Sequence, residues 1–168
     1  YQGAFPGTYR INRAITGKPL VSIIIPFRDE PEYLEKCINS IVAKSTYEHF
    51  EIIGIDNQST EEKTRCIIDS LKKCDERIQF YSYQKPFNYA AINNFAVTKA
   101  RGAHIVLLNS DIEIITRTWI EALLEHSQRK EVGAVGAKLY YKDGSIQHAG
   151  VIIGLSGIAG HIHRYYRE

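Results

Sequence analysis

The sequence predicts an α/β domain built on a mostly parallel sheet that helices cover on both faces. Short β-branched apolar runs recur along the chain, and each is followed by a turn-forming loop and then by apolar residues at helical spacing. Strands that alternate with helices are typical of parallel sheets. The length of 168 residues, of which 44% are hydrophobic, suits one domain with a real core.

The first strand is predicted at residues 21–26 (VSIIIP), a run that suits burial on both faces of a sheet. A helix should begin near Pro31, with Asp29 or Glu30 as its N-cap. Its apolar face would be formed by Leu34, Cys37, Ile38 and Ile41. This strand, loop and helix form the first repeating unit.

The second unit is a strand at 50–55 (FEIIGI), the loop DNQST and a helix. Ser59 and Glu62 have the spacing of a capping box, so the helix should begin between them. The apolar positions that follow are Ile67, Ile68 and Leu71.

The third unit begins with a strand at 78–83 (IQFYSY), and Asn88 is placed to cap a helix that ends near Gly102. A fourth strand is predicted at 104–109 (HIVLLN). The apolar positions of these third and fourth helices are Ala91, Ile92, Phe95, Ala96, Trp119, Ile120, Leu123 and Leu124.

The pattern changes toward the end of the chain. A fifth strand is predicted at 132–141, whose glycines suggest close backbone packing. The Asp-Gly pair within KDGS is a hairpin signal, so an antiparallel excursion is expected over 138–153. The remaining tail, GLSGIAGHIHRYYRE, has no periodicity and is expected to be a mobile loop.

Composition excludes several classes of protein. The formal net charge of +2 and the scattered basic residues argue against nucleic acid as a partner. Three cysteines without C-x-x-C spacing favour neither a disulfide framework nor a zinc site, and they suit a reducing compartment. No apolar run is long enough for a membrane span. Because the sequence lacks methionine, we expect a segment of a longer protein, with a lead at 1–19 and the domain at 20–168.

Acidic residues follow three of the predicted strands. Asp29 or Glu30, Asp56 and Asp111 would meet at the carboxyl edge of a parallel sheet, where open α/β sheets bind ligands. The chain has neither G-x-G-x-x-G nor the P-loop pattern, so a glycine-rich phosphate site is excluded. A divalent cation is the remaining simple way to hold a diphosphate, and Asp111 is placed to bind one. The alternative is that NSD only caps the next helix.

Several ordered segments resemble the family 2 inverting glycosyltransferases. The segments are VSIIIPFRDE, EIIGIDNQSTE, FNYAAINNFAVTKARG, VLLNSDIE and GAVGAKLYYKDGSIQHAG. The resemblance runs from about Pro19 to His163 and implies the glycosyltransferase A fold, a Rossmann-like parallel sheet. The later segments are most similar to bacterial transferases of the rhamnosyl or galactosyl kind that build surface polysaccharides.

The resemblance also implies roles for individual residues. The acidic motif of the family, often D-x-D, reads here Asn109-Ser110-Asp111, so metal binding would depend on Asp111 and the phosphates of the substrate. The usual arginine of the donor-site helix is not evident. Nucleotide-sugar binding would involve Pro26, Phe27, Glu30, Asp56, Asn88, Asn93, Asn109, Ser110 and His148.

The implied reaction transfers a sugar, with inversion, from a nucleoside diphosphate, with UDP or dTDP expected, to a hydroxyl of a glycan or lipid-linked glycan. Mg²⁺ or Mn²⁺ would assist, and the general base is expected beyond the end of this chain. The resemblance implies a cytoplasmic protein and allows peripheral association with the inner face of a membrane. Two alternatives stay open: a non-catalytic module that keeps the fold, and a sugar nucleotidyltransferase, which would want a glycine-rich loop after the first strand.

Overall fold

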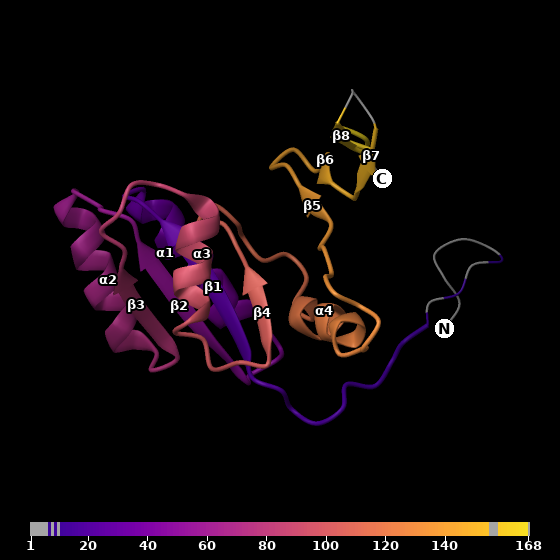
Figure 1. Cartoon of the computed structure of the whole chain (residues 1–168), viewed down its shortest axis with the longest axis horizontal. Coiled ribbons are helices and arrows are strands. Elements are labelled where there is room, and N and C mark those ends of the chain that lie inside the picture. Colours follow the sequence, from indigo (N-terminus) through magenta and orange to yellow (C-terminus); the bar gives the residue numbers. More distant parts are fainter. Residues whose placement is uncertain (1–6, 8, 10, 155–157, 168) are drawn as a thin grey trace.

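The computed structural model describes residues 7, 9, 11–154 and 158–167, and its centre is a four-stranded parallel sheet in the order β3-β2-β1-β4 (Figure 1). The strands are β1 (Val21–Phe27), β2 (Phe50–Asp56), β3 (Ile78–Ser82) and β4 (His104–Leu107). The four helices between and after them are α1 (Pro31–Lys44), α2 (Glu62–Cys74), α3 (Tyr89–Val97) and α4 (Trp119–Ser127). The predicted α/β class is confirmed.

Helices cover the sheet on both faces, and the side chains of its central strands alternate between two hydrophobic cores, one on each face. One side of β1, with Ile23 and Ile25, packs in a cluster with α1, α2 and α4. The opposite side, with Ile24, packs in a second cluster with Ile53 and with Ile92 of α3. Since side chains along a strand point alternately to the two faces, β1 must be apolar at nearly every position. This is why its sequence is a continuous apolar run.

The strand β4 is an edge strand and is only partly covered. It pairs with β1 as far as Leu107 opposite Ile24, and the N–H of Leu108 then donates to the Ile24 carbonyl at 2.9 Å. Its outward positions are solvent-accessible, with Ile105 38% and Leu107 49% exposed. The strand therefore ends two residues earlier than predicted, and Leu107 lies outside the core.

No helix in the part of the chain that the structure describes is long and apolar enough to cross a membrane.

The helix α3 ends at Val97, five residues before Gly102, and turns with 3₁₀-like hydrogen bonds continue through Ala100. The predicted end of this helix, near Gly102, is therefore too far along the chain.

The predicted strand at 132–141 is wrong except at its end. Only Leu139–Tyr140 (β5) is a strand, and it pairs antiparallel with β6 (Ile146–His148). A Cβ added at Gly133 would meet no atom within 4 Å, so this glycine does not mark close packing. Glycine within a strand offers no side chain to pack, which is why the segment fails to pair as a strand despite its valines.

The Asp-Gly hairpin is confirmed, but the excursion divides into two hairpins. The turn between β5 and β6 is closed by Tyr141 N–H donating to the Ser145 carbonyl at 2.8 Å, with Gly144 at a φ of 81°. A second, unpredicted hairpin pairs β7 (Val151–Ile153) with β8 (Ala159–His161). Part of the expected tail is thus ordered, while 155–157 lie outside the described residues.

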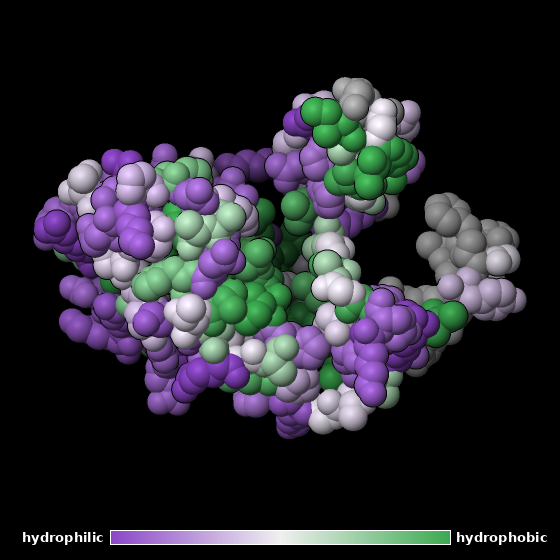
Figure 2. Space-filling view, in the orientation of Figure 1, coloured by the Kyte–Doolittle hydropathy of each residue, from purple (hydrophilic) through white to green (hydrophobic). Residues whose placement is uncertain are grey.

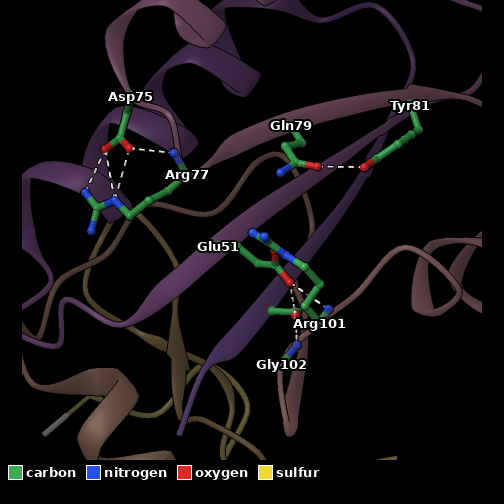
Figure 3. A network of polar contacts seen from close by, with 8 residues as sticks. Glu51, Asp75, Arg77, Gln79, Tyr81, Arg101 and Gly102 are labelled. Carbon is green, nitrogen blue, oxygen red and sulfur yellow. Dashed lines mark hydrogen bonds and ion pairs between the residues drawn. The ribbon is translucent and has the colours of Figure 1, made fainter. Parts of the chain in front are cut away.

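A polar network ties the amino-terminal ends of the central strands together (Figure 3). The buried carboxylate of Glu51 accepts hydrogen bonds from Ser22 Oγ at 2.6 Å and from Arg101 N at 2.8 Å, and it forms an ion pair with the Arg101 guanidinium at 2.7 Å. The N–H of Gly102 donates to Ser22 Oγ at 2.9 Å. Burial alone would raise the pKa of Glu51, yet the hydrogen bonds from Ser22 and Arg101 outweigh burial and lower this pKa.

Candidate functional site

The loop between β1 and α1 has an unusual backbone. Asp29 and Glu30 have φ values of 52° and 55°, which place two consecutive non-glycine residues in the left-handed region. The carboxylate of Asp29 accepts hydrogen bonds from the N–H groups of Thr60 and Glu61 at 2.8 and 2.9 Å. The N–H of Asp29 in turn donates to Ser59 Oγ at 2.7 Å. The loop after β2 therefore holds the strained loop after β1 in place.

These contacts correct the predicted helix caps. Glu30 is the N-cap residue of α1, but its side chain makes no capping hydrogen bond. The helix α2 begins at Glu62, so Ser59 does not form the expected capping box. Asp29 instead supplies an acceptor to the start of α2, and the N–H of Glu61 is the main cause of a pKa of Asp29 below its usual value.

The loop after β2 is joined to both of its neighbours. Asp56 is half-buried, and its Oδ1 accepts a hydrogen bond from the Ser59 N–H at 2.8 Å. Asn57, which is 3% exposed, donates from its backbone to the Phe27 carbonyl at 2.9 Å. Its side-chain amide donates to the carbonyls of Tyr83 and Lys85 at 3.1 and 2.9 Å. The loops after β1, β2 and β3 thus form one interlocked rim.

Asn57 is a site residue that the sequence analysis missed. Its signal was present, since Asn57 follows the last residue of a buried strand directly and is followed by turn-forming residues. Its two partners lie 26 and 28 positions further along the chain. Local sequence patterns do not identify partners at that separation.

The fourth loop presents Asn109, Ser110 and Asp111 after β4. It is held against α1, because the Cys37 thiol approaches the Asn109 carbonyl at 3.7 Å and Ile114 N–H donates to Ser40 Oγ at 3.0 Å. Asp111 is exposed, and the N-cap of α4 is Thr118, seven residues later. The alternative that NSD caps the next helix is therefore wrong.

The predicted nucleoside-binding residues lie in or beside the rim with different exposures. Phe27 is 5% exposed, and its ring packs edge to face on Phe80 with the centroids 5.8 Å apart. Pro26 and Asp56 are half-buried, and Glu30 is exposed. Side-chain contacts with a ligand are thus open to Pro26, Glu30 and Asp56, while the ring of Phe27 belongs to the core.

Two predicted asparagines lie on α3. Asn88 caps the helix as expected, because its Oδ1 accepts a hydrogen bond from Ala91 N–H at 2.9 Å. Asn93 is 6% exposed and donates to the Tyr89 carbonyl at 2.8 Å, which leaves its buried Oδ1 without a partner. An unpaired buried acceptor is costly, so Asn93 is the polar side chain of α3 with hydrogen-bonding capacity to spare.

A hollow of about 530 Å³ lies at the carboxyl end of β3, beside the first turns of α3. Its lining combines polar side chains with the ring of Phe95, a mixture suited to a small polar ligand. The lining residues are Ser82, Tyr83, Gln84, Lys85, Ala91, Asn94 and Phe95. This hollow continues the rim that Asn57 fastens.

His148 lies in β6, outside the parallel sheet. Its Nδ1 is 2.9 Å from Nδ1 of His161 in β8, a contact between the two hairpins that the sequence did not indicate. The turn of its hairpin reaches α1, because Lys142 lies over the ring of Tyr33 in the first turn of that helix at 6.0 Å. The contact between this hairpin and α1 is thus made by the turn, rather than by His148 itself.

The described residues contain no group of three or more histidine, cysteine or acidic side chains arranged to hold a metal ion. Asp111 would therefore have to share a cation with oxygens of the ligand and with water. Mg²⁺ in phosphate-binding sites is commonly held in this way, by one or two carboxylates together with substrate phosphates. The residues present fit that mode of binding and no closed metal cage.

Comparisons with known proteins agree with this geometry. The family model described as "Glycosyl transferase family 2" matches residues 22–159. The protein y4gI of Sinorhizobium fredii is 45% identical over 98% of this chain, and the O-antigen biosynthesis protein RfbC of Myxococcus xanthus is 41% identical over 93%. The chain spans only 18% and 12% of the length of these two relatives.

A solved structure shows the same fold. The mannosyltransferase PcManGT of Pyrobaculum calidifontis, in complex with GDP-Man and Mn²⁺, superposes with a TM-score of 0.63 over 81% of this chain and 40% of its own. Sequence identity is 17%, so this likeness speaks for the fold alone. The glycosyltransferase A architecture is confirmed.

Proposed function

The chain belongs to glycosyl transferase family 2, and on that premise we propose that its rim binds a nucleoside diphosphate sugar and transfers the sugar to a glycan hydroxyl. The interlocking of the loops after β1, β2 and β3 by Asp29 and Asn57 carries the proposal. Binding sites need side chains held in place before the ligand arrives. A rim cross-linked by backbone hydrogen bonds meets that need.

Asp56 is proposed to recognise the base. Its Oδ1 is occupied by Ser59 N–H, and a carboxylate retains further acceptor sites that suit the imide N–H of uracil or thymine. UDP or dTDP is therefore the proposed carrier. Pro26 and Glu30 would line the nucleoside, with Phe27 contributing the backbone that fixes Asn57, while Asn88 and Asn93 would lie toward the sugar.

Asp111 is proposed to bind Mg²⁺ or Mn²⁺ together with the diphosphate, with Asn109 and Ser110 beside it. The ion would stabilise negative charge on the leaving diphosphate. The exposure of Asp111, on a loop fastened to α1, supports this role. PcManGT was solved with Mn²⁺ and a nucleotide sugar, which is consistent with the same arrangement here.

The proposed reaction inverts the anomeric carbon. The acceptor oxygen forms a bond to the anomeric carbon while the bond between that carbon and the diphosphate oxygen breaks. The diphosphate leaves with the electron pair of the broken bond. The proton of the acceptor hydroxyl passes to a general base. The acceptor is proposed to be a growing polysaccharide or a lipid-linked glycan.

Thermal unfolding with UDP, dTDP and GDP, each with and without Mn²⁺, tests the proposal. A ligand at about one hundred times its dissociation constant adds roughly 2.7 kcal/mol, or about 5–10 °C for a domain of this size. We expect one uracil or thymine nucleotide to stabilise the chain in a metal-dependent way. Asp111→Ala should abolish the metal dependence, whereas Asp69→Ala, an exposed aspartate on α2, should not.

The absence of any nucleotide shift would contradict the proposal and favour a non-catalytic module that keeps the fold. Asn109, which stands where the family often has a first carboxylate, is the feature that favours this second reading. Stabilisation by nucleotide without metal would retain the donor site and remove the role given to Asp111.

A further inference from the structure

The hairpin β7–β8 exposes apolar side chains that have no covering layer in the described structure. Ile153 is 89% exposed and Ile158 is 85% exposed, while Val151 and Ile152 are about half exposed. Figure 2 shows hydrophobic residues gathered in the region of β7 and β8, away from the parallel sheet. We call these four residues the apolar tip. Exposing these four isoleucine and valine side chains to water is unfavourable, and a partner that covered them would remove that free-energy cost.

The tip sits on an ordered stem. The N–H of Gly154 donates to the Ile158 carbonyl at 2.9 Å, and Ile162 N–H donates to the Gly150 carbonyl at 3.2 Å. The segment that follows pairs with β6, because Tyr165 N–H donates to Ile146 at 2.8 Å. The tip is therefore carried on strands that backbone hydrogen bonds hold in place.

The stem carries aromatic and basic side chains. Tyr165 and Tyr166 are 65% and 67% exposed. The guanidinium of Arg164 lies 4.9 Å from the ring centroid of Tyr165 and donates to Tyr141 Oη at 2.8 Å. Since a neutral phenol is its partner, Arg164 keeps its charge for an external anion. Tyrosine and arginine beside aliphatic residues is the composition of membrane-interface segments.

Charge along the chain points the same way. Residues 138–168 contain four basic and two acidic side chains, whereas residues 1–137 contain seventeen of each. The whole formal excess of +2 therefore lies in the segment that carries the tip. An anionic lipid surface attracts such a segment, and two copies of it would repel one another. Four apolar residues are also few against the 20–30 residues on each side of a stable protein interface.

We infer that the β7–β8 hairpin inserts its apolar tip into the interface of an anionic bilayer, with Arg164 and the neighbouring tyrosines at the headgroups. The inference deepens the proposed function, on which it rests for its purpose, because a lipid-linked acceptor would reach the rim from a membrane surface. Vesicle binding and nucleotide binding are nevertheless separate measurements.

Co-sedimentation with vesicles tests the inference. The 168-residue chain should bind vesicles of phosphatidylcholine with phosphatidylglycerol, and bind phosphatidylcholine alone more weakly. The double variant Ile153→Asp, Ile158→Asp should lower the partition coefficient at least roughly tenfold. Arg164→Gln should lower it roughly fivefold on anionic vesicles only. Ile11→Asp, the same change at an isoleucine that is 66% exposed elsewhere, should have no effect.

Circular dichroism and the melting temperature check that the variants fold. The milder double variant Ile153→Ser, Ile158→Ser should have a partition coefficient between those of the wild type and the aspartate double variant. Failure of the wild type to bind anionic vesicles, or equal binding by the tip variants, overturns the inference. So does a stable dimer in light scattering that Ile153→Asp dissociates. Loss of the nucleotide shift with vesicle binding intact would remove the proposed function and leave the lipid contact standing.

Discussion

Replacing Glu51 by glutamine should destabilise the domain without touching the rim, because Glu51 lies at the opposite, amino-terminal end of the sheet. Glu51 Oε1 accepts from Ser22 Oγ and Arg101 N, and an amide oxygen can keep both hydrogen bonds. Glu51 Oε2 accepts from Arg101 Nε at 2.8 Å and pairs with Nη2 at 2.7 Å. An NH₂ group in that position loses both of these charge-assisted contacts.

The magnitude follows from the burial of the two partners. Hydrogen bonds to charged groups contribute about 1.5–3 kcal/mol each. The Arg101 side chain is 65% exposed and can return to water, whereas that of Glu51 is 3% exposed. We therefore expect a loss of about 2–3 kcal/mol in the free energy of unfolding, which is at or below the lower end of the sum for two such contacts. For a domain of this length that is roughly 5–10 °C in melting temperature.

Urea unfolding at neutral pH measures the loss, and Glu62→Gln is the matched control. Glu62 pairs with Arg65 at 3.5 Å, but both side chains are at least 67% exposed, so the control should be nearly silent. Because the pKa of Glu51 is lowered in the folded protein, its contribution is complete above its usual pKa of 4.5 and is lost as the pH falls through the lowered value. The gap between wild type and variant should therefore close in acid. A gap under about 1 kcal/mol at pH 7 would refute this account of the network.

Two further predictions concern the interior. Burial raises the pKa of the Cys37 thiol to about 12, while Cys66 and Cys74 are exposed. A thiol reagent at mildly alkaline pH should therefore modify Cys66 and Cys74 quickly and Cys37 only on unfolding. Equal rates for all three cysteines would contradict the packing of α1. A Cβ at Gly54 would lie 2.4 Å from a ring carbon of Phe80, so Gly54→Ala should cost about 1–3 kcal/mol in urea unfolding. Gly133→Ala, which meets no atom within 4 Å, should be neutral, and equal effects of the two changes would show that the Phe80 ring yields freely.

The sequence predicted the sheet well because β1 and β2 are short, β-branched and apolar on both faces, a pattern typical of buried parallel strands. It failed where a residue's partner is distant along the chain. Asp29 or Glu30 was expected to cap α1, yet the Glu30 side chain makes no capping hydrogen bond. The Asp29 carboxylate instead accepts from Thr60 and Glu61, more than thirty positions away. Asp111 lies in the loop after β4, although that strand ends at Leu107, earlier than predicted. The position of this loop depends on its contacts with α1, which local patterns do not encode.

The prediction of a fifth strand failed for a related reason. Valines at 132 and 135 favour a strand, but a strand also needs a neighbour with matching free hydrogen-bonding groups. The residues described here provide such a neighbour only for Leu139–Tyr140. Pairing, rather than propensity, therefore decided how much of this segment became sheet.

The cross-linking of the rim constrains how its specificity can be changed. Asn57 reaches backward to Phe27 and forward to Tyr83 and Lys85, so the three loops it touches share one set of hydrogen bonds. A chimera that takes only one of these loops from a relative would lose the hydrogen bonds between that loop and its neighbours, and the donors of Asn57 would lack their acceptors. Exchange of the proposed nucleoside-binding rim should therefore succeed when the three loops are transplanted together.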